Sequence, residues 1–392
     1  MIKHRKPMKF LSRSLVASVM VAGVLAAGCS NTRDHVEPPT KLVDVRGEFA
    51  PRIVWSASTG SAQPGKLLRL VPYVEGGVAY TVDPAGKLTA VDLDSGATRW
   101  ARSLDVKATA GLGGGEGLLV LATEDGELIA VERETGEVRW RKPLTTLAWA
   151  RPAVAGGKVI VRTGDGRVFA FDAVKGTRLW VEARSVPALS LQGQSDPVVL
   201  GNEAVLIGYD NGALVVHALA DGRSLWETQV ALPSGRSDID RMVDIDATPL
   251  VDRGVVYALS YQGRLAAVEL RSGQPLWNRE MSGYSSMTAD SGTVYFSDAR
   301  GAVWAVDKAG GQPLWRQEAL LHRALSAPVL AGRWLVVGDL EGYVHFLSPD
   351  DGHIVARTRV DGGRVVGQPV PTRQGVLVLT EGGRLTLVAV PD

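Results

Sequence analysis

The chain has 392 residues, of which 45% are hydrophobic and 22% are charged. These values are typical of a soluble globular protein, exclude a largely disordered chain, and by length alone allow two or three ordinary domains. The formal net charge is +1, but residues 1–28 carry five basic residues and no acidic one, which leaves 38 basic against 42 acidic residues in the remainder. No basic stripe survives there, so nucleic acid is excluded as an expected partner.

The N-terminus has the pattern of a secretory signal. Basic residues precede an apolar run over residues 15–27, which is too short for a comfortable bilayer span. The run ends in the letters LAAGCS, which place Cys29, the only cysteine of the chain, directly behind it. An ordinary signal peptide that ends near a free thiol is the alternative interpretation, but an unpaired cysteine is a liability in an exported protein.

The stretch LAAGCS resembles the lipobox of bacterial lipoproteins, although Ala26 stands where leucine is commoner. The resemblance implies that residues 1–28 form a lipoprotein signal peptide and that Cys29 is lipidated and anchors the chain to a membrane. Ser30 follows, not the aspartate that retains lipoproteins in the inner membrane in enteric-type sorting. We therefore expect the lipidated protein to reside on the periplasmic face of the outer membrane. The polar, proline-bearing residues 29–48 predict a flexible tether.

A repeat of about 40 residues fills the rest of the chain. Each copy begins at a turn glycine, and six copies have a second turn glycine 10 residues later and a tryptophan 14 residues after the first. The first glycines are Gly86, Gly126, Gly166, Gly212, Gly263, Gly301, Gly342 and Gly383. The tryptophans are Trp100, Trp140, Trp180, Trp226, Trp277 and Trp315. Such a fixed period indicates a repeat architecture.

Each repeat contains four short runs with alternating apolar and polar residues, joined by Gly, Asp and Asn turns, and no sustained helical stripe. This pattern predicts an all-β fold, an eight-bladed β-propeller of four-stranded blades over residues 49–392. The last copy ends before its tryptophan, and Trp55 lies 45 residues before Trp100. We therefore expect the N-terminal strand to complete the last blade. Ala356 replaces the tryptophan of blade seven, which predicts a less well-packed seam there.

The repeat A-x-[DE]-x-x-x-G-x-x-x-W resembles the tryptophan-docking repeat of quinoprotein dehydrogenases. Within that superfamily, an eight-bladed lipoprotein of this length, with the stretches PALSLQGQSDP (187–197), SDIDRMVDIDATPLV (237–251) and LLHRALSAPVL (320–330), is similar to the BamB family. The resemblance implies a non-enzymatic scaffold of the machinery that assembles outer-membrane β-barrels. The implied partner is the periplasmic domain of the barrel-forming subunit, and nascent outer-membrane proteins are a second candidate.

Two repeats are longer than the others, at 46 and 51 residues, and these insertions are candidate binding loops. Leu189 and Leu191 are apolar residues in a polar loop, and acidic residues crowd the second insertion, which suggests anchors beside a charged rim. The family resemblance assigns partner contacts to Leu189, Leu191, Gln192, Arg241, Asp244 and Asp246. Gln192 stands where the family often carries arginine, a charge that Arg241 is expected to supply. Tolerated surface insertion is the alternative.

The strongest competing function is a quinoprotein-like propeller that binds a periplasmic ligand, either a cofactor or a glycan. One cysteine cannot form the vicinal disulfide that quinoprotein enzymes often carry, and the sequence shows no clustered carboxylates and amides for a cation. We expect no catalytic residues, no cofactor and no metal. The letters DNG at 210–212 are interpreted as turn chemistry. His217 and His345 are expected at strand positions and not as ligands.

Overall fold

The structure is a computed structural model and describes residues 37–45, 47–60, 68–191 and 193–391. The predicted signal peptide and Cys29 lie outside the described residues. The chain divides into two units, residues 1–38 and 39–392, and the second unit is built of strands. Across the described ranges, no helix of a length and hydropathy that would cross a membrane occurs.

Over the described residues, thirty-two strands form eight sheets of four. Blades one to four comprise β2 (Tyr73–Glu75), β3 (Val78–Val82), β4 (Lys87–Asp92), β5 (Thr98–Ser103), β6 (Gly113–Gly115), β7 (Leu118–Ala122), β8 (Glu127–Glu132), β9 (Val138–Pro143), β10 (Ala153–Ala155), β11 (Lys158–Arg162), β12 (Arg167–Asp172), β13 (Arg178–Ala183), β14 (Val198–Leu200), β15 (Ala204–Gly208), β16 (Ala213–Ala218) and β17 (Ser224–Gln229). Blades five to eight comprise β18 (Leu250–Asp252), β19 (Val255–Leu259), β20 (Arg264–Glu269), β21 (Pro275–Glu280), β22 (Thr288–Ala289), β23 (Thr293–Ser297), β24 (Val303–Asp307), β25 (Pro313–Gln317), β26 (Val329–Ala331), β27 (Trp334–Gly338), β28 (Tyr343–Leu347), β29 (Ile354–Arg359), β30 (Val370–Thr372), β31 (Gly375–Leu379), β32 (Arg384–Ala389) and β1 (Arg52–Ser58).

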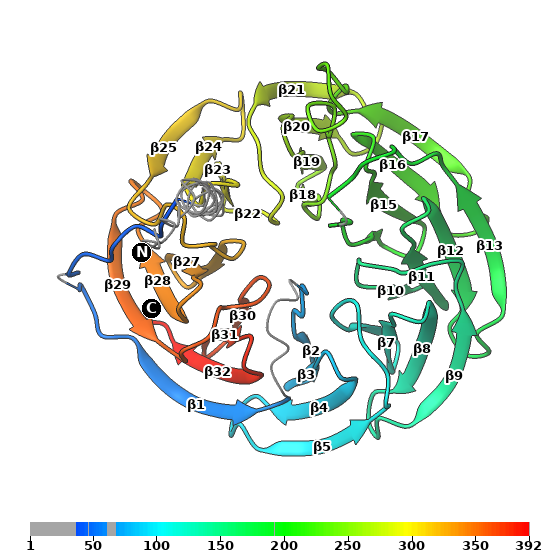
Figure 1. Cartoon of the computed structure of the whole chain (residues 1–392), viewed down its shortest axis with the longest axis horizontal. Coiled ribbons are helices and arrows are strands. Elements are labelled where there is room, and N and C mark those ends of the chain that lie inside the picture. Colours follow the sequence, from blue (N-terminus) through cyan, green and yellow to red (C-terminus); the bar gives the residue numbers. More distant parts are fainter. Residues whose placement is uncertain (1–36, 46, 61–67, 192, 392) are drawn as a thin grey trace, which may run out of the picture. The chain divides into compact units, whose positions relative to one another are not determined.

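The eight blades stand around a common axis, and the first strand of the ring closes the last blade (Figure 1). β1 pairs antiparallel with β32, with Trp55 opposite Leu387, so the sheet order of blade eight is β1-β32-β31-β30. The central strands of each blade are buried and their residues form clusters shared by neighbouring blades. The predicted eight-bladed propeller and its closure by the N-terminal strand are confirmed.

The recurring tryptophan joins each blade to the next one. Its ring covers the second turn glycine of the following blade. In five of the repeats the indole N–H also donates to a main-chain carbonyl of the same turn, from Trp140, Trp180, Trp226, Trp277 and Trp315. Trp226, for example, donates to Leu270 O at 2.8 Å, and a Cβ added to Gly273 would lie 2.8 Å from its ring. Gly273 has a φ of +74°. Glycine is therefore required at this position for two reasons: the backbone is left-handed, and the indole ring leaves no room for a Cβ.

Replacing Gly273 with alanine should destabilise the protein strongly. The left-handed backbone costs about 1–2 kcal/mol with a Cβ, and the contact with Trp226 adds about 1–3 kcal/mol of overpacking. Gly254→Ala, in the same blade, is the matched control because its φ is +81° but nothing lies within 4 Å of the added Cβ. Urea unfolding should show the larger loss for Gly273→Ala, and equal losses would contradict the role of the docked ring.

Blade seven has no tryptophan at the docking position, where Ala356 stands, yet its seam with blade eight is closed. The expectation of a less well-packed seam is wrong, because Ala356 is buried and Phe49 lies against Trp334 and Phe346 at ring-centroid distances of 5.4 and 5.3 Å. The other tryptophans dock on a turn between the third and fourth strands of the next blade. In blade eight these two strands, β32 and β1, come from opposite ends of the chain, so that turn does not exist.

The C-terminal part of the predicted tether contacts the propeller. Thr40 N donates to Leu321 O at 3.0 Å, and Glu48 N donates to Val355 O at 2.9 Å. Arg323 and Arg357 donate to main-chain carbonyls of the same segment. These bonds place residues 40–45 and 47–49 along blades six and seven, so the described part of this segment is bound to the ring.

Candidate functional site

The first insertion lies between β13 and β14 and is anchored at its C-terminal end. Gln194 Oε1 accepts a hydrogen bond from the main-chain N–H of Trp149 at 3.1 Å, and Ser195 Oγ donates to the main-chain oxygen of Gly208 at 3.1 Å. Asp196 accepts from both the main chain and the guanidinium of Arg151, at 2.8 and 2.7 Å. The preceding residues of the loop are thereby carried on a fixed base.

Leu189 and Leu191 are exposed apolar residues of this anchored loop, with 40% and 38% of their surface accessible, and Val186 nearer its start is exposed to 41%. Both leucine side chains are accessible to solvent, and their contact with a partner stays a prediction. Gln192, which the family resemblance places in the same contact, lies outside the described residues. Leu191 also lines a cavity of about 320 Å³, together with Leu68, Arg69, Gly193, Asp246 and Tyr284 among others.

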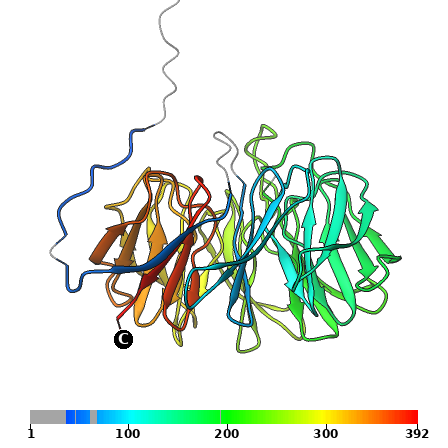
Figure 2. The same ribbon diagram turned by 90° about the horizontal axis from the view of Figure 1, so that it is seen from below.

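The second insertion lies between β17 and β18 and has two parts. Residues 232–241 form an exposed tip, and residues 242–247 form a buried segment, called the return, that leads back to β18. Arg241 pairs with Asp238 at 2.8 Å within the tip, which projects from the face of the ring (Figure 2). The return is fixed by two main-chain bonds: Ile245 N donates to Tyr209 O at 3.2 Å, and Tyr261 N donates to Asp244 O at 2.9 Å. Arg241 therefore has a partner in its own loop.

Asp244 and Asp246 do not form a charged rim. Their exposed fractions are 0% and 1%, whereas the rim interpretation requires carboxylates in contact with solvent. Ile245 between them packs into the core of blades four and five, and alternate residues of an extended segment point to opposite sides. The burial of Ile245 thus turns both aspartates together toward the turn between β15 and β16.

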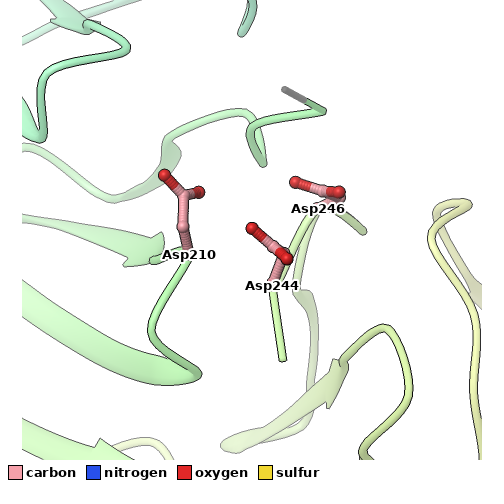
Figure 3. A group of neighbouring side chains, drawn as sticks. All are labelled: Asp210, Asp244 and Asp246. Atoms are coloured by element: carbon pink, nitrogen blue, oxygen red, sulfur yellow. The ribbon is translucent and has the colours of Figure 1, made fainter. Parts of the chain in front are cut away.

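The two aspartates meet Asp210 of that turn (Figure 3). One oxygen from each of the three carboxyl groups lies within 4.8 Å of the others, and all three residues are buried. In five other blades the side chain of the residue three before the turn glycine accepts from turn N–H groups, as Asp339 accepts from Glu341 N and Tyr343 N. Tyr209 occupies that place in blade four, and Asp210 follows it with its carboxylate directed inward.

Arg162 at the end of β11 pairs with Asp210 across the seam between blades three and four. The Nη2–Oδ1 distance is 2.5 Å, and the Arg162 side chain is fully buried. Its guanidinium lies 5.1 Å from the centre of the Tyr209 ring, which is a favourable cation–π position. Arg69, in contrast, donates to the main-chain oxygens of Asp246 and Tyr284, both at 2.8 Å.

Burial raises the pKa of Asp244 to about 7, with repulsion from Asp246 and Asp210 adding to the effect. Burial also raises the pKa of Asp246 to about 6, against the opposing attraction of Arg69. The raised pKa values show that the surrounding side chains do not fully compensate the negative charges of the two carboxylates. A hard cation is one species that the arrangement can hold, contrary to the expectation of no clustered carboxylates.

Sequence reasoning missed Asp210 and Arg162. The DNG stretch was assigned to turn chemistry alone, but the carboxylate of Asp210 bonds to Arg162 and not to the turn. A usable signal was present, because Arg162 ends an inner strand whose counterparts in the other blades end in small or apolar residues: Val82, Ala122, Gly208, Leu259, Ser297, Gly338 and Leu379. A buried arginine at such a position requires an acidic partner nearby.

The two candidate histidines lie on strands, as predicted. His217 on β16 contacts the Tyr209 hydroxyl through Nε2 at 2.9 Å and the Gly222 carbonyl through Nδ1 at 2.8 Å. His345 on β28 lies with Nε2 3.0 Å from Asp339 Oδ2. Both rings therefore serve buried polar networks of their own blades.

The sequence matches the family model described as outer membrane protein assembly factor BamB over residues 84–317 and 301–391. A protein of that name from Alkalilimnicola ehrlichii is 44% identical over 380 residues, covering 97% of both chains. The chain belongs to the BamB family. The BamB of Pseudomonas aeruginosa is 41% identical and covers 95% of this chain and 98% of its own.

Solved structures agree with this assignment. The crystal structure of BamB from Moraxella catarrhalis superimposes with a TM-score of 0.80 at 28% identity, covering 87% of this chain and all of the other. A quinohemoprotein alcohol dehydrogenase from Pseudomonas putida reaches a TM-score of 0.68 at 14% identity, which shows a shared fold alone. The resemblance to the BamB family and the propeller architecture inferred from the repeats are both confirmed.

Proposed function

We propose that this BamB-family chain is a non-enzymatic outer-membrane protein assembly factor that acts as a scaffold, by docking onto the periplasmic domain of the barrel-forming subunit. The observation that carries the proposal is the pair Leu189 and Leu191, half exposed on a loop whose base is fixed by Gln194, Ser195 and Asp196. Apolar side chains on an anchored loop lose little conformational freedom on binding, which favours a specific interface. The relatives' names, outer membrane protein assembly factor, support the biological setting.

The buried aspartates have a supporting role in this proposal. Gly193 lies so close to Asp246 that an added Cβ would approach its carboxylate Oδ2 to 2.6 Å, so the first insertion rests directly on the second. Asp244 and Asp246 therefore position the loop that carries the leucines. Arg241 and the exposed tip of the second insertion flank it as the polar edge of the contact.

A lipid at Cys29 would hold the propeller at the periplasmic face of the outer membrane, next to the barrel-forming subunit. The support for this part is the sequence: a basic and apolar leader, a lone cysteine directly behind it and Ser30 at the following position. Nascent outer-membrane proteins passing the same machinery are further candidate partners.

The test replaces Leu189 and Leu191 with alanine and measures affinity for the isolated periplasmic domain of the barrel-forming subunit. Burying each leucine is worth up to about 1.5–3 kcal/mol, so the double variant should bind at least about tenfold more weakly. Leu276→Ala/Leu314→Ala is the matched control, because these leucines are exposed on outer strands of blades five and six. Unchanged affinity of the first variant, or an equal loss in the control, would place the interface elsewhere.

A further inference from the structure

Asp210, Asp244 and Asp246 bring three carboxyl groups together in the interior of the propeller. They come from two separate segments, the turn between β15 and β16 and the return of the second insertion, and their exposed fractions are 5%, 0% and 1%. Carboxylates are rarely buried to this degree unless they are paired or coordinate a metal. Figure 3 shows the three groups around a common space.

The hydrogen bonds of the cluster are incomplete. Within the part of the chain that the structure describes, both carboxylate oxygens of Asp244 and both of Asp246 have no hydrogen-bond partner, although each is shielded from solvent. Buried polar atoms in native proteins nearly always have a partner, and an isolated buried charge is especially costly. Nε and Nη1 of the nearby Arg162 are likewise buried without a partner, so this guanidinium does not satisfy the four carboxylate oxygens. The four acceptor atoms therefore indicate a bound species that supplies positive charge.

The charge of the cluster fits a divalent ion. The buried guanidinium of Arg162 neutralises one of the three carboxylates through its 2.5 Å contact with Asp210. Arg69 is only partly buried, and its Nη1 and Nη2 donate to main-chain oxygens of Asp246 and Tyr284. Two carboxylate charges remain in the dry interior, which one divalent cation balances.

We propose that Asp210, Asp244 and Asp246 form a Ca²⁺ site beneath the first insertion. All three ligand groups are carboxylates, which hard cations prefer, and no histidine or cysteine is among them. Mg²⁺ retains several waters and is seldom enclosed by protein ligands alone, whereas Ca²⁺ accepts a cage of carboxylate and carbonyl oxygens. An ion here ties the return of the second insertion to the turn of blade four and supports Gly193 above Asp246.

The experiment uses the full-length chain, stripped with a chelator and exchanged into chelator-free buffer at a pH of about 8. Scanning calorimetry compares the unfolding midpoint with and without about 5 mM CaCl₂, and sites of this kind outside the cytosol bind Ca²⁺ at about 0.1–1 mM. The midpoint of the unsubstituted protein should rise by about 2–4 °C with Ca²⁺ and by less with the same concentration of MgCl₂.

Asp244→Asn and Asp246→Asn should lose the Ca²⁺-dependent rise while remaining as stable as the parent in chelator, because each removes an uncompensated buried charge. Asp238→Asn, on the exposed tip of the same insertion, should keep the full rise. No rise in the parent chain, or the same rise in the Asn variants, would overturn the site. An equal rise with MgCl₂ would overturn the choice of ion. Should the Asn variants not fold, calorimetric titration of the parent with CaCl₂ decides, with binding of one ion per chain expected.

Discussion

Removal of β1 should abolish the cooperative thermal transition of the propeller. β1 supplies the outer strand of blade eight, and its deletion (residues 52–58) exposes the full edge of β32. The loss includes Trp55, whose indole N–H donates to Leu93 O at 2.8 Å and whose ring covers Gly96 of blade one. Trp55 is partly buried, and truncating a fully buried aromatic costs about 3–5 kcal/mol, against a total stability of about 5–15 kcal/mol for a typical domain. The unpaired edge of β32 adds to the loss.

The matched control deletes seven residues that carry little packing, residues 232–238 of the exposed tip in the second insertion. Circular dichroism melts of the two deletion variants and the parent chain should show a transition near that of the parent for the control alone. Two similar midpoints would mean that the ring does not depend on its closing strand, and an unpaired β32 edge should also make the β1 variant aggregate.

The ring itself was predictable from sequence because its physical requirements repeat. Each seam needs a glycine with positive φ and an indole above it, so both residues recur at a constant offset that is visible without a structure. The same logic predicted closure, since a tryptophan before the first repeat, Trp55, and a truncated last repeat imply that the chain ends share one sheet. Repetition converts a three-dimensional contact into a periodic pattern.

Contacts that occur once were not predictable in the same way. Phe49 fills the seam that Ala356 leaves open, but nothing repeats it, and its polar neighbours gave the segment the composition of a tether. Asp244 and Asp246 were interpreted as exposed because acidic residues usually are. What buries them is Ile245, whose packing in the core between blades four and five fixes the side to which both neighbours point.

Asp210 illustrates a further limit of sequence patterns. The DNG stretch resembles the acidic turns of other blades, but Tyr209 takes the position that elsewhere binds the turn, as in blade seven. One substitution in the repeat thus releases a carboxylate from turn chemistry for contact with Arg162 and the second insertion. Departures from a repeat are therefore where single contacts, and with them the candidate site, should be sought.

Asp339→Asn should be the most destabilising single substitution of a charged residue in blade seven. Asp339 Oδ2 accepts from Arg323 Nε at 2.7 Å and lies 3.0 Å from His345 Nε2, and all three side chains are buried. Arg323 also donates to Thr40 O at 2.9 Å, so the same carboxylate orders the segment that precedes Phe49. Removing one partner of a buried ion pair costs about 3–5 kcal/mol because the other charge stays buried, and the remaining pair of Arg323 with the half-exposed Glu341 offsets part of this cost.

Burial alone raises the pKa of Asp339, but the contacts with His345 and Arg323 outweigh it and hold the pKa below its usual value. The stabilisation from the carboxylate is therefore fully present above about pH 4 and is lost as the pH falls through the lower, folded-state value. The difference in free energy of unfolding between the parent and Asp339→Asn should not shrink until the pH drops below about 4.

Asp298→Asn is the matched control, because Asp298 binds the turn N–H groups of Arg300 and Ala302 in blade six as Asp339 binds those of blade seven. Asparagine keeps these acceptor bonds in both turns, so the excess loss in Asp339→Asn, measured by urea unfolding at neutral pH, reports the buried charge. If both variants lost a comparable free energy of unfolding, the destabilisation would come from the turn hydrogen bonds and not from the buried charge. A difference that vanishes already at pH values well above 4 would mean that Asp339 is not the group that titrates, and that the polar network of blade seven is stabilised through neutral hydrogen bonds.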